Sequence, residues 1–330
     1  MLNEFRQDLV SGEWVLLATG RGKRSDSRHV EDVYQSAEGC PFENPVESGQ
    51  EIAMTYPDDK NWKAVIIKNK YPALKAGACG PDMSFGPFKT HAAVGDHEVV
   101  IYKNHERRFD EFTPEEITDA VRVYKKRYLE LSTKIECTQY ILIFHNHGAE
   151  AGASIYHPHS QIITMPILPP DVSRSIYGSY DYYKQNNKRV YDVILEWEMA
   201  QKTRIVYENS DFVVFCPFVS KYPYELRIFP KISHAHFEQM PENKDSVFAD
   251  ALYTGIQKIR RALGKPAFNF FIHTAPLASD INVKMHEFYT WHVEIIPHVK
   301  IDAGFEIGTG VEINVIDPDE AAAILKNVKI

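Results

Sequence analysis

One pattern occurs twice in this sequence, and the repetition limits what the chain can fold into. A strand-like apolar segment runs into a Lys-Tyr-Pro turn at residues 63–74, and a second segment does the same at residues 211–226. In each copy further strand material follows, then a long amphipathic helix and another apolar strand. Two copies of one unit build two similar halves. We therefore expect an α+β fold in which each half is a mostly antiparallel sheet with a long helix.

Each copy closes with a short strand, PHSQII in the first and WHVEII in the second. Aligning the two strands places His159 at the position of His292, and Gln161 at the position of Glu294. Because side chains alternate between the faces of a strand, His159 and Gln161 project to the same side. Buried imidazole and amide groups need polar partners, so this face predicts a functional site rather than plain core.

Start and stop signals predict three helices. Thr113 and Glu116 form a capping box ahead of an apolar pattern of helical period. A second such pattern ends at Gly264, a residue that often terminates helices. Asp317, followed by proline, begins a third helix near the end of the chain.

The length of 330 residues leaves room for two domains or for one domain built from two halves. We place the first half at residues 1–168 and the second at residues 169–330. The segment from about 164 to 205 carries a Pro-Pro pair and many tyrosines, and we interpret it as the linker between the halves.

Composition narrows the classes of partner and location. A net charge of −8 argues against broad binding to nucleic acid or to anionic membranes. No run reaches the roughly 18 apolar residues of a membrane span, and the N-terminus has no apolar signal region. We therefore expect a cytoplasmic protein. In a reducing compartment its cysteines should be thiols or ligands rather than disulfides: Cys40, Cys79, Cys137 and Cys216.

Six motifs together resemble one known family. In chain order they are GRGKRSD, NKYPAL, HNHGAEAGAS, HPHSQ, HTAP and AGFEIGTG. This set is similar to the galactose-1-phosphate uridylyltransferase branch of the histidine-triad superfamily, from about residue 4 to the C-terminus. The resemblance implies two histidine-triad-like halves, a homodimer, and transfer of a nucleotidyl group by double displacement.

The resemblance assigns catalytic roles to two residues of the HPHSQ motif. His159 matches the family's nucleophile, and a histidine nitrogen can attack an activated phosphorus to give a labile phosphoramidate. Gln161 matches the residue that donates a hydrogen bond to the α-phosphoryl oxygen. An amide cannot readily protonate a leaving group or activate water, so glutamine here favours transfer over hydrolysis.

Two loops are implied to contact the nucleotide. In the small-residue loop before the nucleophile, Asn146, Gly152 and Ser154 match family contacts, and such loops let backbone N–H groups approach a phosphate. In GRGKR, Arg21 and Arg24 match residues near the phosphates and ribose, where a planar guanidinium pairs well. As bare patterns, both stretches are also compatible with ordinary surface loops.

The resemblance also implies a zinc site. Where the family often carries Cys-Pro-Phe-Cys, this chain has Cys40 and Glu43. His105 and His157 match the other two ligands. One thiolate, one carboxylate and two imidazoles make a plausible tetrahedral zinc shell, and the alternative is a weaker site or none.

A second metal site is implied with less of its ligand set present. His273 and His292 match two ligands, but the next ligand position carries Glu294. The carboxylate expected from the 164–205 segment has no clear counterpart, and Ser175 lies near its place. The two histidines are therefore either ligands or hydrogen-bonded core residues.

The AGFEIGTG motif matches the loop that contacts the hexose across the dimer, with Phe305 and Glu306 at the contact positions. The expected function is exchange of UMP between UDP-glucose and galactose 1-phosphate. The residues after Glu306 differ from the family pattern, and related proteins with a similar loop use ADP-glucose and phosphate. An ADP-glucose phosphorylase with the same nucleophile is thus the alternative. A regulator with a vestigial site is disfavoured, because a mere binder does not need His159.

Overall fold

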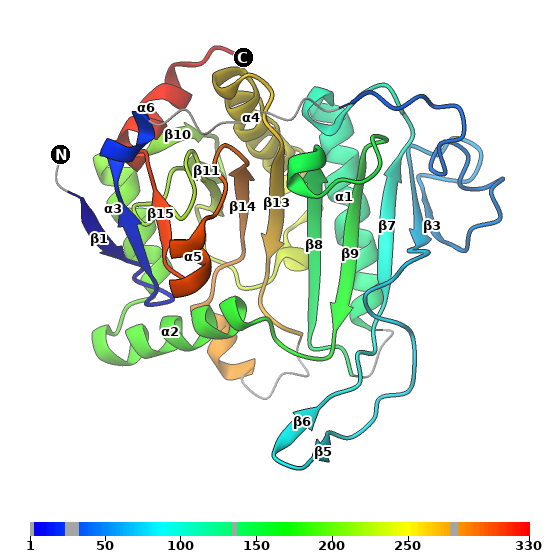
Figure 1. The fold of residues 1–330 in the computed structure, drawn as a ribbon, viewed down its shortest axis with the longest axis horizontal. Coiled ribbons are helices and arrows are strands. Elements are labelled where there is room, and N and C mark those ends of the chain that lie inside the picture. The colour runs from blue at the N-terminus through cyan, green and yellow to red at the C-terminus, as the bar shows by residue number, and fades with distance from the viewer. Residues whose placement is uncertain (1–2, 24–32, 134–136, 278–282) are drawn as a thin grey trace.

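A single sheet of ten antiparallel strands forms the centre of the computed structural model, which describes residues 3–23, 33–133, 137–277 and 283–330 (Figure 1). The strand order is β10-β11-β12-β14-β13-β8-β9-β7-β4-β3. The strands of the first half are β3 (Ile52–Tyr56), β4 (Ala64–Lys68), β7 (His97–Tyr102), β8 (Tyr140–His147) and β9 (His159–Met165). Those of the second are β10 (Ile205–Glu208), β11 (Phe212–Phe215), β12 (Leu226–Pro230), β13 (Phe268–His273) and β14 (His292–Pro297).

The strand order repeats the duplication seen in the sequence. Reading inward from either edge, the first three strands follow chain order and the last two are exchanged: β3-β4-β7-β9-β8 and β10-β11-β12-β14-β13. The halves join where β8 pairs antiparallel with β13, with His145 opposite Phe270. The α+β class and the two similar halves are therefore confirmed. The boundary at residue 168 remains a prediction.

One face of the sheet carries the two long helices, α1 (Pro114–Ser132) and α4 (Asp245–Leu263), which contact each other. The predicted capping box is present, since Thr113 accepts the Glu116 N–H and Glu116 reaches back to the Thr113 N–H. Gly264 ends α4 with a φ of 73°. Tyr124, Phe248 and their neighbours on these helices pack with the sheet into the main core. This shared core holds the two halves together on one face of the sheet.

The opposite face is covered differently in the two halves. Over the second half lie α2 (Pro170–Asn186) and α3 (Val190–Gln201), whose side chains form a second core with β11 and β12. These helices occupy most of the segment that the sequence suggested as a linker. Over the first half, Phe42 from the loop after Gly39 closes a smaller cluster on β4 and β7, with Cys40 packed against it. The first half thus keeps room for a site on this face.

Segments from both ends of the chain complete the second half. A small sheet joins β1 (Glu4–Gln7) and β2 (Trp14–Leu17) to β15 (Glu312–Asn314), which pairs parallel with β2. The predicted last helix is α6 (Pro318–Asn327), capped by Asp317. The AGFEIGTG segment forms a short helix, α5 (Gly304–Thr309). The hairpin of β5 (Met83–Phe85) and β6 (Phe88–Thr90) projects from the first half (Figure 1).

One expectation about the cysteines is wrong. Cys79 and Cys137 form a disulfide, with Cα atoms 5.9 Å apart, while Cys40 and Cys216 are free. The two partners lie 58 positions apart, in the loop before β5 and just before β8. The tertiary fold brings these loops together, and the wide spacing in the sequence carried no sign of it.

Candidate active site

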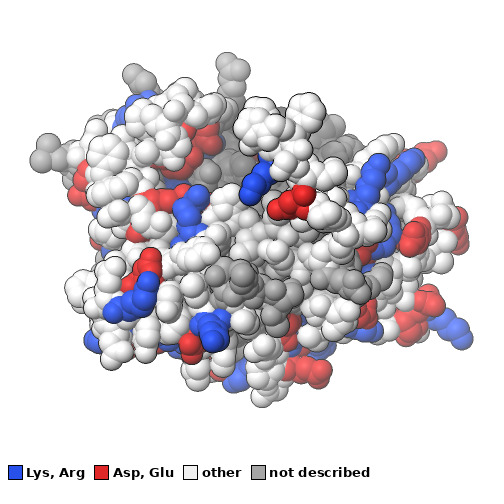
Figure 2. Space-filling model, turned by 90° about the horizontal axis from the view of Figure 1, so that it is seen from below, with Lys and Arg blue, Asp and Glu red and all other residues white. Residues whose placement is uncertain are grey.

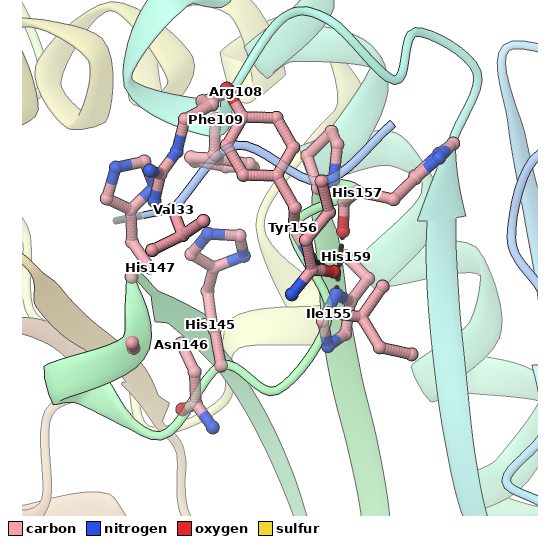
Figure 3. A pocket seen from close by; sticks show the side chains of 15 residues that line it. Val33, Arg108, Phe109, His145, Asn146, His147, Ile155, Tyr156, His157 and His159 are labelled. Carbon is pink, nitrogen blue, oxygen red and sulfur yellow. Dashed lines mark hydrogen bonds between the residues drawn. The ribbon is translucent and has the colours of Figure 1, made fainter. Parts of the chain in front are cut away.

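His159 is held on β9 in the form that a nucleophile needs. Its side chain is buried, and its Nδ1–H donates to the carbonyl oxygen of His157 at 2.9 Å (Figure 3). The proton on Nδ1 leaves the lone pair on Nε2. Burial lowers the pKa of His159, which favours the neutral ring. The edge of Phe42, at a ring-centroid distance of 5.2 Å, restricts the ring further.

The small-residue loop turns beside this histidine. A pocket of about 150 Å³ is lined by the loop and by side chains from β8, β9 and the segment after β7 (Figure 3). The lining includes Asn146, His157 and His159, together with Gly148 and Ala153. The structure therefore brings three of the predicted site residues and their loop into one place.

Asn146 and Gly152 meet at the base of the loop. Gly152 has a φ of +86°, and a Cβ at this position would lie 3.7 Å from Nδ2 of Asn146. Asn146 Oδ1 accepts a hydrogen bond from Asn269 Nδ2 at 2.8 Å. Because the oxygen is occupied, the amide N–H₂ of Asn146 is the group left to donate to a ligand. Ser154 is exposed two residues further along the loop.

Gln161 lies on the same face of β9 as His159, as the strand alternation predicts. It is partly buried, and its Oε1 lies 2.7 Å from Nε2 of His97 on β7. This contact joins the predicted catalytic glutamine to a residue that sequence reasoning did not select.

Three of the four predicted zinc ligands, Cys40, His105 and His157, have donor atoms within 4.8 Å of one another, and Glu43 lies beside the two histidines. Nδ1 of His105 lies 3.1 Å from Nδ1 of His157, and Glu43 Oε2 lies 3.5 and 3.6 Å from the same two atoms. Cys40 Sγ lies 3.8 Å from His157 Nδ1. Ligand atoms around a tetrahedral zinc ion are about 3.3–3.8 Å apart, given bond lengths of about 2.0–2.3 Å.

The hydrogen bonds around this cluster orient its donors inward. Nε2–H of His105 donates to Gln35 O at 2.7 Å, and Nε2–H of His157 donates to Tyr102 O at 2.5 Å. Both Nδ1 atoms therefore carry lone pairs, as metal-binding imidazoles do. Burial lowers the pKa of His157 to about 4, which keeps this ring neutral. Glu43 Oε2 is buried without a hydrogen-bond partner. The cluster fits a cation of the zinc type.

Three other predicted contacts lie elsewhere. Arg21 is exposed on the short turn Thr19–Lys23, and Arg24 lies outside the described residues. Phe305 and Glu306 lie on α5 beside the second half, and the pocket at His159 does not include them. Glu306 accepts the Ala303 N–H at 3.1 Å and so caps its own helix. Within one chain, the predicted hexose contacts are not brought to His159.

The second cluster of possible ligands, in the second half, already contains a positively charged side chain. His273 Nε2 lies 3.3 Å from Glu294 Oε2, and His292 Nε2 lies 3.9 Å from Glu294 Oε1. The guanidinium of Arg227 on β12 lies 3.1 Å from Glu294 Oε1. Although burial opposes ionisation, Arg227 holds the pKa of the Glu294 carboxyl well below its usual range. The three donors are close enough for a metal, but Arg227 already supplies the positive charge. Ser175 lines the same pocket and brings no carboxylate.

Sequence reasoning missed the residues that orient the site from a distance. Asn269 on β13 holds the Asn146 amide, and its Oδ1 lies 2.5 Å from His298 Nε2. His97 contacts Gln161. No motif marks Asn269 or His298. His97 begins an apolar strand segment downstream of NKYPAL, and this position was its only signal in the sequence.

Comparison with known proteins shows the family. Residues 2–169 match the family described as "Galactose-1-phosphate uridyl transferase, N-terminal domain", and residues 93–328 match a domain of unknown function, DUF4921. An ADP-glucose phosphorylase from Arabidopsis thaliana is 32% identical over 99% of this chain and 93% of its own length. A galactose-1-phosphate uridylyltransferase from Thermotoga maritima is 28% identical over 99% of both chains. The chain belongs to the galactose-1-phosphate uridyl transferase family.

Solved structures agree in fold. The structure of an Arabidopsis thaliana ADP-glucose phosphorylase with bound ADP-glucose superposes with a TM-score of 0.84, 30% identity and full coverage of both chains. A uridylyltransferase structure has a TM-score of 0.75 at 23% identity, covering 98% of this chain and 97% of its own. The second match supports the fold alone.

Proposed function

We propose that the protein transfers a nucleotidyl group from a nucleoside diphosphate sugar through a covalent adduct on His159. The observation that carries the proposal is the geometry of this residue. Its Nδ1–H is bonded to the His157 carbonyl, which leaves Nε2 as the free nitrogen of a buried, neutral imidazole. Such a nitrogen is a competent nucleophile toward phosphorus.

The reaction balances in two displacements. Nε2 of His159 attacks the α-phosphorus, an N–P bond forms, and the bond to the bridging oxygen breaks, so that the sugar leaves as its 1-phosphate. An oxygen of the acceptor phosphate then attacks the same phosphorus, and the N–P bond breaks. The imidazole is regenerated, and a phosphate group leaves as a stable anion, so no general acid is required.

The neighbouring groups can stabilise charge at the phosphorus. Asn146 offers its N–H₂, because Asn269 occupies its oxygen. The left-handed turn at Gly152 leaves space for a phosphoryl oxygen beside that amide. Gln161 donates from the same strand face as the nucleophile, and Ser154 extends the polar loop. Hydrogen-bond donors fixed in this way lower the barrier for transfer.

We also propose one structural zinc ion per chain, held by Cys40, Glu43, His105 and His157. A zinc ion with four protein ligands supplies rigidity and leaves no open position to activate water. Its support is the close grouping of the Cys40, His105 and His157 donor atoms, with Glu43 beside the two histidines, and the bonds that turn both Nδ1 atoms inward. We propose no second metal, because Arg227 neutralises Glu294 in the other cluster.

Two donors are candidates for the reaction. We put ADP-glucose with phosphate as acceptor first, since the Arabidopsis thaliana ADP-glucose phosphorylase is similar over the whole chain in both sequence and fold. UDP-glucose with galactose 1-phosphate, the expectation from the motifs, is the second candidate. It has the support of the matched family and of the Thermotoga maritima uridylyltransferase.

Intact-protein mass spectrometry tests both levels of the proposal. The enzyme is incubated with ADP-glucose or with UDP-glucose and no acceptor, and then weighed after removal of ligand. We expect an acid-labile adenylyl or uridylyl mass on the peptide that contains His159. No adduct with either donor would overturn the mechanism, and a uridylyl adduct alone would exchange the order of the two donors.

Partners and assembly remain proposals. Nucleotide sugars and sugar 1-phosphates are the proposed partners, on the support of the matched family and of the related structure with bound ADP-glucose. Acidic and basic side chains are interspersed on the face in Figure 2. Among the described residues, no helix is long and apolar enough to cross a membrane. We propose a homodimer in which Phe305 and Glu306 of the partner subunit reach the sugar, because α5 of the same chain is not part of the pocket at His159. A cytoplasmic location is likewise a prediction.

A further inference from the structure

We propose that His97 is a positioning residue that fixes the orientation of the Gln161 amide. The inference rests on the proposed function and deepens it, because it names the group that makes Gln161 a donor toward the substrate. It depends on three contacts around one imidazole ring, and these contacts also decide which ring nitrogen of His97 carries the proton.

The backbone of the NKYPAL turn sets the tautomer of His97. The N–H of Ala73 donates to Nδ1 of His97 at 3.1 Å. A backbone N–H can only donate, so Nδ1 must be the acceptor and must lack a proton. In a neutral imidazole the proton is then on Nε2. The main chain of His97 is tied to the same motif, because its carbonyl oxygen accepts the Asn69 N–H at 2.9 Å.

The proton on Nε2 of His97 selects one end of the Gln161 amide. Nε2 lies 2.7 Å from Gln161 Oε1, so the ring donates and the amide oxygen accepts. Asn69 Nδ2 lies 3.2 Å from the same nitrogen, but a ring that accepts at Nδ1 has no lone pair left at Nε2. The hydrogen bond from His97 therefore belongs to Gln161.

The orientation of Gln161 matters for the reaction because one end of an amide accepts hydrogen bonds and the other end donates them. With Oε1 occupied by His97, the N–H₂ of Gln161 is free on the strand face that also carries His159. A flipped amide would present an oxygen to the α-phosphoryl group and would repel its growing negative charge. His97 excludes that orientation without touching the substrate. The NKYPAL motif gains a role, since its turn supplies the N–H that starts this chain of bonds.

Two substitutions at position 97 separate orientation from packing. His97→Phe keeps a ring of similar size and removes both polar atoms. His97→Gln keeps one acceptor and one donor on a side chain of similar reach. His91→Phe is the matched control, since His91 pairs with Asp82 at the base of the projecting hairpin, whose two strands form a sheet separate from the one that carries His159.

The measurement is the single-turnover rate of adduct formation on His159, together with the donor concentration that gives half of the maximal rate. Removing one fixed donor from an oxyanion site costs roughly 10²–10³-fold. We expect His97→Phe to slow adduct formation about 10- to 100-fold with little change in the half-saturating concentration. His97→Gln should recover most of the rate, and His91→Phe should match the wild type. In a Gln161→Ala background, His97→Phe should add no further loss.

Several results would overturn the inference. They are a wild-type rate for His97→Phe, a loss that His97→Gln does not recover, or losses at positions 97 and 161 that multiply. Absence of any adduct on the wild-type enzyme would instead refute the proposed function. In that event nitrogen-15 spectra of histidine-labelled wild-type protein still show which ring nitrogen of His97 carries the proton. The signal of His97 is identified as the one that is missing in His97→Phe. A protonated Nδ1 on His97 would disprove the orientation that we infer.

Discussion

The two halves of the molecule place a histidine at the same point of the same strand, but different groups surround the two rings. His159 on β9 and His292 on β14 are both buried, and each donates from Nδ1 to the backbone carbonyl two residues earlier. In the first half a small-residue loop and the Asn146 amide surround the free nitrogen. In the second half the matching space holds Glu294 and Arg227.

The difference shows that the strand sets the tautomer, while the neighbouring strands decide what the ring can do. In the second half Arg227 on β12 lies 3.1 Å from Glu294 and 3.1 Å from Glu225. The helices α2 and α3 close this face, and ring stacking with Phe229 holds His292 at 4.6 Å. A ring enclosed in this way is part of the core. In the described part of the first half no long helix packs on this face, and His159 lines the pocket beside the small-residue loop.

The largest expected difference lies between the two histidines themselves. His159→Ala should reduce nucleotidyl transfer by about 10⁴-fold or more, since a covalent nucleophile is lost. His292→Gln should leave the rate within about threefold, because its ring lies in the enclosed half. Steady-state assays with saturating donor measure both. A comparable loss in His292→Gln, with native circular dichroism, would show that the second half takes part in the reaction.

Metal analysis contrasts the two clusters of possible ligands. Purified wild-type protein grown with sufficient zinc should hold one zinc ion per chain, and Cys40→Ala should hold less than about a tenth of one. Glu43→Cys should retain the metal, because thiolate is a strong zinc ligand. Chelation should also lower the melting temperature of the wild type. If the wild-type protein contains no zinc, the proposed site is wrong, and Glu43 and His105 are ordinary structural residues.

Removing the arginine tests what replaces the metal in the second half. Arg227→Met leaves Glu225 and Glu294 buried without a cation, so the free energy of unfolding should fall by about 3–5 kcal/mol. Arg174, which is half-exposed and pairs with Asp171 and Glu13 near the surface, is the control, and Arg174→Met should cost less than about 1 kcal/mol. Denaturant titrations provide the two values. Equal losses would mean that Arg227 is not the counter-charge of the second cluster.

The smallest expected effect concerns the partition between transfer and hydrolysis. Gln161→His introduces an imidazole that can supply a proton, which an amide cannot, so hydrolysis should rise relative to transfer by about tenfold or more. Product analysis with and without sugar 1-phosphate or phosphate gives the ratio. An unchanged ratio would argue against a role for Gln161 at the α-phosphoryl group.

How much of the fold was predictable depends on how local its signals are. The helix α1 was found because Thr113 and Glu116 cap it within one turn. The helices α2 and α3 were missed, and neither has a side-chain hydrogen bond at its N-cap, where Pro169 and Arg189 stand. Helices that depend on packing rather than capping leave a weaker trace in the sequence.

The residues of the candidate site also fall into those with local signals in the sequence and those without. His159, Gln161, Asn146 and the loop between them lie within 16 positions of one another, and their motifs placed them together. Asn269 reaches Asn146 from 123 positions away, and His97 reaches Gln161 from 64. No periodicity connects such pairs, so neither orienting residue could be selected in advance.

The sequence by itself determined the duplication, the α+β class, the long helices and the strand that carries His159, because each depends on neighbours within a turn or a strand. The tertiary structure alone decided that Cys79 bonds to Cys137, that His97 orients Gln161, and that Arg227 occupies the second cluster. These contacts join segments far apart in the chain. Their existence depends on strand order and register, which bring distant side chains within hydrogen-bond or covalent reach.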